Sequence, residues 1–291
     1  MIKKKNLILG IGILLCLSTV LIAGCADQGP GTETEGKISI GLVSWDCAIA
    51  SSNVMKTVFE KAGYEVELVS VDAGVLYQGL ANGDVDFTTT GWLPHTHESY
   101  WETYGDRIDY VNENIKGAAR IGLVVPAYVT IDSIEEMNGV VDQFDGRIIG
   151  IEPGAGIMSR TEQAIEEYDL NYELVASSSA GMAAELTSSI NDDEWVVVTG
   201  WFPHWKFGRW DLKFLEDPKG VYGDAEDIVT LARQGLKTDD PKAYGILTRF
   251  EWTSEDIASV MTDIADGMPE EEAAKKWVEN NPETVDYWIN G

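Results

Sequence analysis

A five-residue segment occurs twice in this 291-residue chain, and it constrains the fold more than any other feature. Gly91-Trp92-Leu93-Pro94-His95 and Gly200-Trp201-Phe202-Pro203-His204 agree at four of five positions. Each copy follows a run rich in threonine or branched apolar residues, which predicts that it lies at the end of a β-strand. The repeat therefore predicts two lobes, each of which brings one tryptophan to a shared ligand site.

The segment before the first copy has the strand–helix–strand order of a parallel α/β unit. We expect a strand over 37–44, a helix capped by Ser51-Ser52-Asn53, and a second strand over 64–71. Trp45 directly follows the first of these strands. Ligands of parallel sheets bind where the strands end, so Trp45 is expected at the same binding edge as Trp92 and Trp201.

A second unit of this kind begins with a strand over 147–151. It continues through a Gly-x-Gly turn at 154–156 into a helix over 160–168. Such a turn exposes backbone N–H groups at a helix N-terminus, where an anion binds favourably. The third glycine of a dinucleotide site and the lysine of a phosphate loop are both missing, which leaves a small anion site or a merely tight turn.

The order of the expected elements predicts that the chain crosses between the lobes twice. A strand over 119–125 would lead into the second lobe, and a strand over 227–232 would lead back. We therefore expect lobe 1 to comprise 37–125 plus 231–291 and lobe 2 to comprise 126–230. A hinge and a ligand cleft would lie between them.

The N-terminus predicts export. Basic residues 3–5 precede an apolar stretch over 7–22, as in a signal peptide. Residues 21–25 (LIAGC) resemble the lipobox of exported lipoproteins, which implies a signal peptide over 1–24, lipidation of Cys25 and a tether over 25–36. A plain transmembrane anchor is the alternative. Cys47 would then be the only cysteine of the folded part, so we expect neither a disulfide nor a cysteine metal site.

The charge of the chain excludes some partners. The formal net charge is -28, and removal of the first 24 residues, which hold three lysines and no acidic residue, would leave -31. Nucleic acid and anionic membrane surfaces would be repelled. We interpret the charge as adaptation to a salty exterior, where dissolved ions screen the self-repulsion.

Catalytic motifs are missing from the sequence. It contains no Gly-x-Ser-x-Gly elbow and no phosphate loop, and we expect neither enzymatic activity nor a cofactor. The three histidines are His95, His97 and His204. A zinc site built from them is one alternative, although the spacing supports it weakly.

The strand-end tryptophans indicate a different chemistry. Indole faces attract cations, and a quaternary ammonium that cannot donate hydrogen bonds gains about 0.5–2 kcal/mol from each desolvated face. Trp45, Trp92 and Trp201 would form such a cage. A carboxylate on the same ligand would need donors, which the amides of Gly156 and Ile157 and the side chain of His97 would provide.

Six segments together resemble the glycine betaine/proline betaine-binding lipoproteins of ABC importers. They are SWDCAIASSNV, ANGDVDFTTTGWLPHTH, GLVVPAYV, GIEPGAGIMS, VVVTGWFPHWKF and LKFLEDPK. The resemblance implies an α/β, type II periplasmic-binding-protein fold with two lobes. It also implies an extracytoplasmic, monomeric protein that delivers its ligand to a membrane permease.

The same resemblance assigns roles to six residues. It implies that Trp45, Trp92 and Trp201 enclose the ammonium and that Gly156, Ile157 and His97 hold the carboxylate. His95, where several relatives have asparagine, and Cys47 depart from the family pattern. A carrier for choline or carnitine is the alternative within this class, and a zinc-binding surface protein using His95, His97 and His204 is the alternative outside it.

Overall fold

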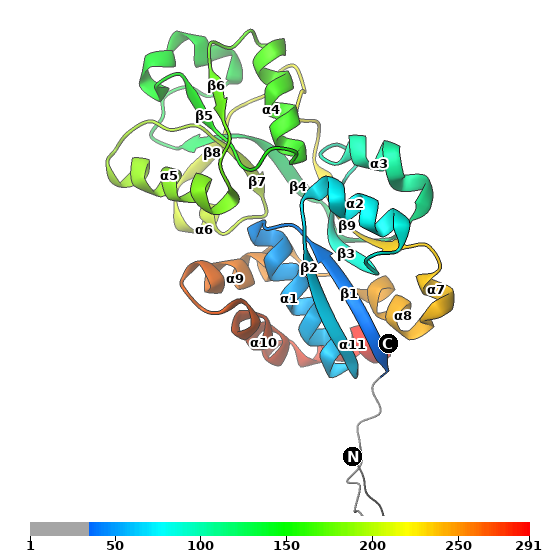
Figure 1. Ribbon diagram of the computed structural model, residues 1–291. Helices are drawn as coiled ribbons and strands as arrows, with labels where there is room; N and C mark the ends of the chain where they lie inside the picture. The colour runs from blue at the N-terminus through cyan, green and yellow to red at the C-terminus, as the bar shows by residue number, and fades with distance from the viewer. Residues whose placement is uncertain (1–34) are drawn as a thin grey trace, which may run out of the picture. The chain divides into compact units, whose positions relative to one another are not determined.

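The computed structural model describes residues 35–291 (Figure 1). The expected signal peptide over 1–24, Cys25 and nearly all of the tether over 25–36 lie outside the described residues. None of the helices within 35–291 combines the length and the apolar character that a membrane crossing requires.

The first lobe begins as a parallel unit, as expected. Strand β1 pairs in parallel with both β2 and β3. Because right-handed crossovers run from β1 outward to β2 and then back to β3, helices α1 and α2 cover opposite faces of the sheet (Figure 1). The elements are β1 (Gly36–Leu42), α1 (Asp46–Lys61), β2 (Tyr64–Ser70), α2 (Ala73–Asn82) and β3 (Phe87–Leu93).

Two strands connect the lobes. Strand β4 (Ile108–Pro126) pairs over its first part with β9 (Glu226–Arg233), and β9 pairs in turn with β3. The second part of β4 pairs with strands of the other lobe. The pair Ala119–Glu226 is the last between β4 and β9, so the lobes meet there. The expected lobe boundaries at 125/126 and 230/231 fall inside these two strands.

The second lobe repeats the parallel arrangement. Strand β5 pairs in parallel with β6 and β7, and β7 and β8 both pair antiparallel with the end of β4. Its elements are β5 (Arg147–Ile149), α4 (Gly156–Glu167), β6 (Glu173–Val175), α5 (Ser179–Asn191), β7 (Val198–Phe202), α6 (Lys206–Arg209) and β8 (Leu212–Phe214). Two short 3₁₀ segments, Ile134–Gly139 and Val141–Phe144, precede β5.

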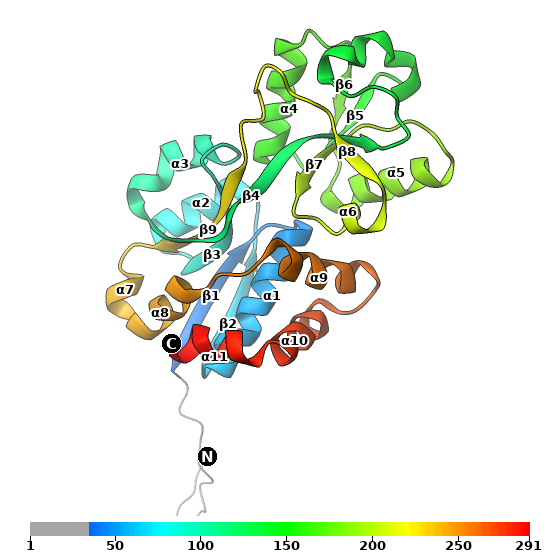
Figure 2. The ribbon, with the colours of Figure 1, turned by 180° about the vertical axis from the view of Figure 1, so that it is seen from behind.

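The C-terminal helices return to the first lobe and cover it from behind (Figure 2). Helices α9 and α10 pack on α1, and α11 packs on α8. A core of aromatic side chains lies beneath them, in which Trp252, Trp277 and Trp288 contact one another or Phe250. The helices are α3 (Glu98–Tyr104), α7 (Leu236–Asp239), α8 (Pro241–Arg249), α9 (Ser254–Ala265), α10 (Glu270–Asn280) and α11 (Pro282–Asn290).

The expected cap of the first helix is wrong. Helix α1 begins at Asp46, directly after Trp45, and residues 51–53 lie inside it and are buried. The hydroxyl of Ser51 bonds that of Thr89 in β3 at 2.6 Å. Ser51 therefore bonds the sheet, whereas the side-chain amide of Asn53 donates to the carbonyl of Ile49 in the same helix. Tertiary packing overrides the local preference of these residues for a cap position.

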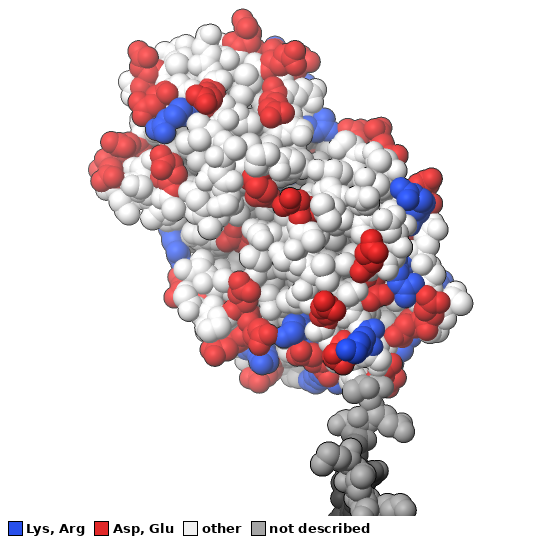
Figure 3. Space-filling model, viewed as in Figure 1, with Lys and Arg blue, Asp and Glu red and all other residues white. Residues whose placement is uncertain are grey.

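The surface agrees with the charge of the sequence. Acidic side chains outnumber basic ones on the visible face and gather mainly toward its margins (Figure 3). The basic side chains that are present mostly pair with acidic ones at the surface, as Lys37 does with Glu65 and Lys276 with Asp263. A surface of this kind repels polyanions.

Candidate functional site

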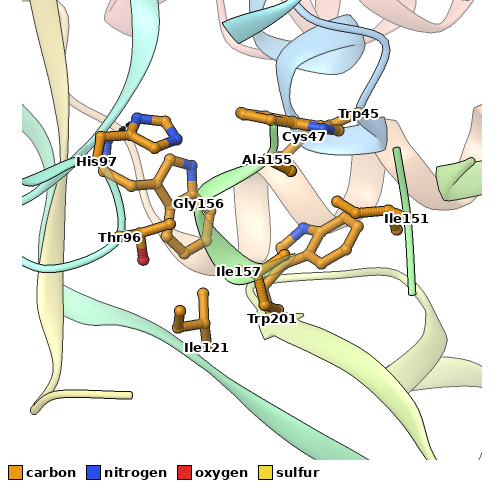
Figure 4. Close-up of a pocket in the computed structure, with 11 residues that line it drawn as sticks. Trp45, Cys47, Thr96, His97, Ile121, Ile151, Ala155, Gly156, Ile157 and Trp201 are labelled. Carbon is orange, nitrogen blue, oxygen red and sulfur yellow. Dashed lines mark hydrogen bonds between the residues drawn. The ribbon is translucent and has the colours of Figure 1, made fainter. Parts of the chain in front are cut away.

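A cavity between the two lobes collects all six predicted site residues. About 310 Å³ of the cavity and its open mouth is free of protein atoms, which is in the range of small-solute sites. In Figure 4 Trp45 lies above the cavity, Trp201 below it and His97 at its left. The lining residues are Trp45, Cys47, Trp92, Thr96, His97, Ile121, Ile151, Ala155, Gly156, Ile157 and Trp201. The lining contains no acidic or permanently charged side chain.

The two repeated segments occupy equivalent places. Trp92 in β3 pairs with Ile228 of β9, and Trp201 in β7 pairs with Ile121 of β4. Each tryptophan therefore lies opposite a residue two positions from the Ala119–Glu226 pair where the lobes meet. A cis-proline stands two residues after each tryptophan. The repeat thus places one indole on each side of the junction between the lobes.

The glycine that opens each repeat allows a close approach to the crossing strands. A β-carbon on Gly91 would lie 2.7 Å from a methyl group of Val229, and one on Gly200 would lie 2.4 Å from a methyl group of Val124. Distances this short are not tolerated between carbon atoms. Glycine at these two positions lets β3 and β7 dock on β9 and β4.

Trp45 comes from the N-terminus of α1 and is held from the opposite lobe. Its indole N–H donates to the carboxylate of Glu152, which lies between β5 and α4. Burial raises the pKa of Glu152, and the bond from Trp45 only partly offsets this. Trp45, Trp92 and Trp201 are 6%, 3% and 4% exposed, so the three indoles are shielded from solvent.

His97 carries a hydrogen-bond donor that has no partner in the described structure. The backbone N–H of Trp92 donates to His97 Nδ1 at 3.1 Å, and the hydroxyl of Tyr77 lies 3.0 Å from the same atom. Because Nδ1 accepts, the proton of the neutral ring is on Nε2, which is buried and unbonded. Burial lowers the pKa of His97 to about 3, so the ring is a neutral donor.

The segment that carries His97 is fixed from β9. The buried carboxylate of Glu226 accepts hydrogen bonds from the backbone amides of His95 and Thr96, at 2.9 and 3.0 Å, and from the Thr96 hydroxyl. This carboxylate orients the turn in which His97 lies.

Helix α4 turns its N-terminus toward the cavity. The amides of Gly156 and Ile157 are the first two of the helix, and amides at these positions have no carbonyl one turn earlier to bond. Both residues line the cavity. The N-terminus also carries the positive end of the helix dipole, so a carboxylate is favoured there.

A carboxylate beside the cage connects the lobes. Asp46 in α1 accepts hydrogen bonds from the hydroxyl of Ser179 at 2.6 Å and the indole of Trp205 at 2.7 Å. His204 Nε2 lies 3.6 Å away. Burial alone would raise the pKa of Asp46, but its interactions with these three side chains hold that pKa well below its usual range. Asp46 is therefore a fixed negative charge at the junction.

Further contacts close the rim of the cavity. Arg160 in α4 binds the carbonyl of His95 at 2.9 Å and the carboxylate of Glu98 at 2.6 Å. The hydroxyl of Tyr100 donates to the carbonyl of Gly154. Both contacts join one lobe to the other, so the structure has the lobes closed over the cavity.

The three histidines of the alternative zinc site are not brought together. His97 faces the cavity, His204 lies against Asp46, and His95 packs on Gly223. Among residues 35–291 no three side chains of histidine, cysteine or acidic residues form a group able to hold a metal ion.

Sequence reasoning missed several residues of the site. Cys47 lines the cavity beside the indole of Trp201, where burial raises its pKa to about 12 and keeps the thiol neutral. Ile121 and Ile151 add apolar surface. Only the position of Cys47, two residues after Trp45, gave a signal in the sequence. Glu152 and Glu226 gave none, because their roles depend on contacts across the fold.

Comparison with known proteins places the chain in a family. Residues 36–280 match the family model described as the substrate binding domain of ABC-type glycine betaine transport systems. A glycine betaine/carnitine transport binding protein, GbuC, of Listeria monocytogenes is 50% identical over 153 residues, which are 52% of this chain and 51% of that protein. In this alignment the chain thus spans about half the length of the curated relative.

Solved structures agree with this. Lactococcal OpuAC, in its closed-liganded conformation with glycine betaine, is 40% identical, with a TM-score of 0.84 over 88% of this chain and all of that one. A choline-binding protein of an ABC transporter, in complex with choline, is 27% identical, with a TM-score of 0.82 over 88% of this chain and 92% of that one. The two-lobed binding-protein fold predicted from the sequence is confirmed. The chain belongs to the family of substrate-binding domains of ABC-type glycine betaine transport systems, which are transporter components and not enzymes.

Proposed function

We propose that this protein binds glycine betaine in the cavity between its lobes and delivers it to a membrane permease. The observation that carries the proposal is the pairing of three buried indoles with unbonded hydrogen-bond donors in one cavity. The indoles of Trp45, Trp92 and Trp201 would hold the trimethylammonium group. His97 Nε2–H and the amides of Gly156 and Ile157 would hold the carboxylate.

The expected interaction free energies are consistent with a cage that binds the ammonium group and donors that bind the carboxylate. Three desolvated indole faces at about 0.5–2 kcal/mol each supply several kcal/mol. Charge-assisted hydrogen bonds from His97 and the helix N-terminus add to this at the other end of the ligand. After the cost of ordering, the total is sufficient for a micromolar dissociation constant.

Calorimetric titration of the purified protein with glycine betaine tests the proposal. We expect saturable binding of one ligand, weakened about 2- to 30-fold by Trp45→Leu, Trp92→Leu or Trp201→Leu. Trp195→Leu, which removes a tryptophan that packs on Phe144 in the second lobe, is the matched control and should bind normally. Absence of heat at millimolar glycine betaine would contradict the proposal.

Choline and carnitine remain the alternative ligands. Choline lacks a carboxylate, so it would leave the buried His97 donor and the α4 amides without an acceptor on the ligand, which costs free energy. Carnitine has a carboxylate but is longer. Titration with all three ligands ranks them, and tighter binding of choline than of glycine betaine would favour the alternative.

We further propose that the protein is an exported monomer, anchored at the outer face of the membrane through Cys25. Substrate-binding proteins of ABC importers are extracytoplasmic. The LIAGC segment and the polar stretch that follows it support lipidation and a flexible tether. Mass spectrometry of the mature N-terminus should show an acylated Cys25, and an unmodified chain that begins at Met1 would refute the anchor.

A further inference from the structure

Lys206 is a buried lysine without a hydrogen-bond partner. It begins helix α6, two residues after the end of the second repeat, and its side chain is fully buried. The amine Nζ bonds to no acceptor in the described structure. A buried amine in this state is costly, so its position needs an explanation other than stability.

The amine lies over the indole of Trp201. Nζ is 4.5 Å from the centre of that ring. Trp201 lines the cavity, but Lys206 is not among the lining side chains. The indole therefore separates the amine from the cavity, and a ligand cation in the cage would share the ring with Lys206.

Among Lys206 and its ionisable neighbours Asp46, Cys47 and His204, Lys206 is the group whose charge changes near neutral pH. Burial lowers its pKa to about 7, against the opposing influence of Asp46 and Cys47 on α1. Asp46 stays ionised, because its pKa is held below the usual range. The thiol of Cys47 stays neutral, since burial raises its pKa to about 12. His204 stays neutral too, since burial lowers its pKa to about 4.

We propose that Lys206 is a specificity residue that acts through Trp201 and disfavours ligands with net positive charge relative to zwitterions. The proposal rests on the ammonium cage proposed above. A protonated Lys206 repels a quaternary ammonium on the other face of the ring. In a betaine, attraction to the carboxylate offsets part of this repulsion. Choline carries no negative charge, so none of this repulsion is offset.

The sign of the pH dependence follows directly. Below pH 7 the amine is protonated, and cation binding is weakened; above pH 7 it is neutral, and the charge of Asp46 favours the cation. Two unit charges on either side of one ring interact, at an effective dielectric constant near 20, strongly enough to change affinity on the order of 10-fold.

Calorimetry of the full chain at pH 6.0 and 8.5 tests this, with choline and glycine betaine as probes. We expect the dissociation constant of choline to fall about 10-fold with rising pH, and that of glycine betaine to fall less than about 3-fold. Lys206→Met should abolish both changes and bind as the wild type does at pH 8.5. The control is Lys219→Met, since Lys219 lies over the ring of Tyr168 at a similar 4.6 Å but away from the cavity.

A second measurement does not depend on a variant that folds or on detectable choline binding. Linkage requires that a ligand repelled by the charged amine also lowers the pKa of that amine. Lysine ¹³Cε chemical shifts should show a lower pKa for Lys206 when the wild type is saturated with glycine betaine. Binding of glycine betaine without any change in this pKa overturns the proposal, as does a Lys206→Met variant that keeps the pH profile. Absence of glycine betaine binding at either pH overturns the proposed function instead.

Discussion

A β-carbon on Gly156 would lie 2.0 Å from the carbonyl oxygen of Thr96, which belongs to the other lobe. The first residue of α4 therefore touches the turn that carries His97 with no room for a side chain. The obstacle is a backbone atom, so it cannot move aside as a flexible side chain would. Only a glycine at this position lets the lobes close to the separation seen here.

Gly156→Ala should accordingly prevent full closure. We expect the lobes to stay apart and the dissociation constant of glycine betaine to rise at least about 100-fold, since ligand contacts from both lobes are lost together. Small-angle scattering with and without ligand measures closure, and calorimetry measures affinity. Gly139→Ala is the control, because a β-carbon there meets no atom within 4 Å. Ligand-induced compaction of Gly156→Ala equal to that of the wild type would contradict this prediction.

Removal of the His97 donor should weaken the binding of ligands that have a carboxylate more than the binding of ligands that lack one. His97→Phe keeps a ring of similar size but loses Nε2–H, and we expect glycine betaine to bind about 10- to 100-fold more weakly. Choline, which has no carboxylate, should change less than about 3-fold. Because the pKa of His97 is about 3, its contribution to betaine binding should be constant from pH 5 to pH 8. An equal loss for both ligands would show that His97 acts only through packing.

The bond between Trp45 and Glu152 should contribute to affinity through charge. Glu152→Gln keeps an acceptor for the indole N–H but removes the negative charge, and we expect glycine betaine to bind roughly 3- to 10-fold more weakly. Glu162→Gln, an exposed substitution on α4, should leave the affinity unchanged. Unchanged binding by Glu152→Gln would limit this residue to orienting the ring.

Acid should destabilise the fold through its buried histidines. Burial lowers the pKa of His204 to about 4 and that of His97 to about 3, whereas both are near 6.5 in the unfolded chain. Between pH 6.5 and pH 4 the unfolded state binds the extra protons, so stability is greatest above this range and is lost as the pH falls. Each histidine contributes about 1 kcal/mol per pH unit.

Denaturant unfolding at pH 7.0 and 4.5 measures this effect. Acidification also relieves the repulsion among the many surface carboxylates, so the comparison with His204→Gln isolates the histidine. The variant should lose less stability on acidification than the wild type does. An equal loss in both proteins would exclude His204 as a source of acid sensitivity.

The sequence predicted the two-lobed fold and six residues that line the cavity, but not every strand around that cavity. The two repeats marked Trp92 and Trp201, because a tryptophan at a strand end followed by proline has few structural reasons to recur. By contrast, the first half of β4 went unpredicted, since polar residues such as Asn112 and Asn114 interrupt its apolar pattern. Asn114 is fully buried and bonds Thr230 of β9 at 3.0 Å, a partner more than a hundred residues away.

Contacts between distant parts of the chain also explain why the sequence did not indicate the charged residues around the site. Glu152, Asp46 and Glu226 look like ordinary members of an acidic chain, and Lys206 looks like a surface lysine at the start of a short helix. Their roles depend on contacts between residues that are far apart in the sequence. Periodicity and local spacing carry no information about such contacts, and the resemblance to a known family implied the six proposed ligand contacts but none of these charged residues.

The position of the two repeats on the crossing strands also has a mechanical consequence. Trp92 and Trp201 each pair with a residue about 7 Å along the strand from the Ala119–Glu226 pair, close to the axis about which the lobes would turn. The outer ends of the lobes lie much farther from that axis. A small rotation of the lobes at the cage would therefore produce a large displacement at their outer ends. A partner that contacts the outer ends of both lobes would distinguish an occupied cavity from an empty one by this displacement.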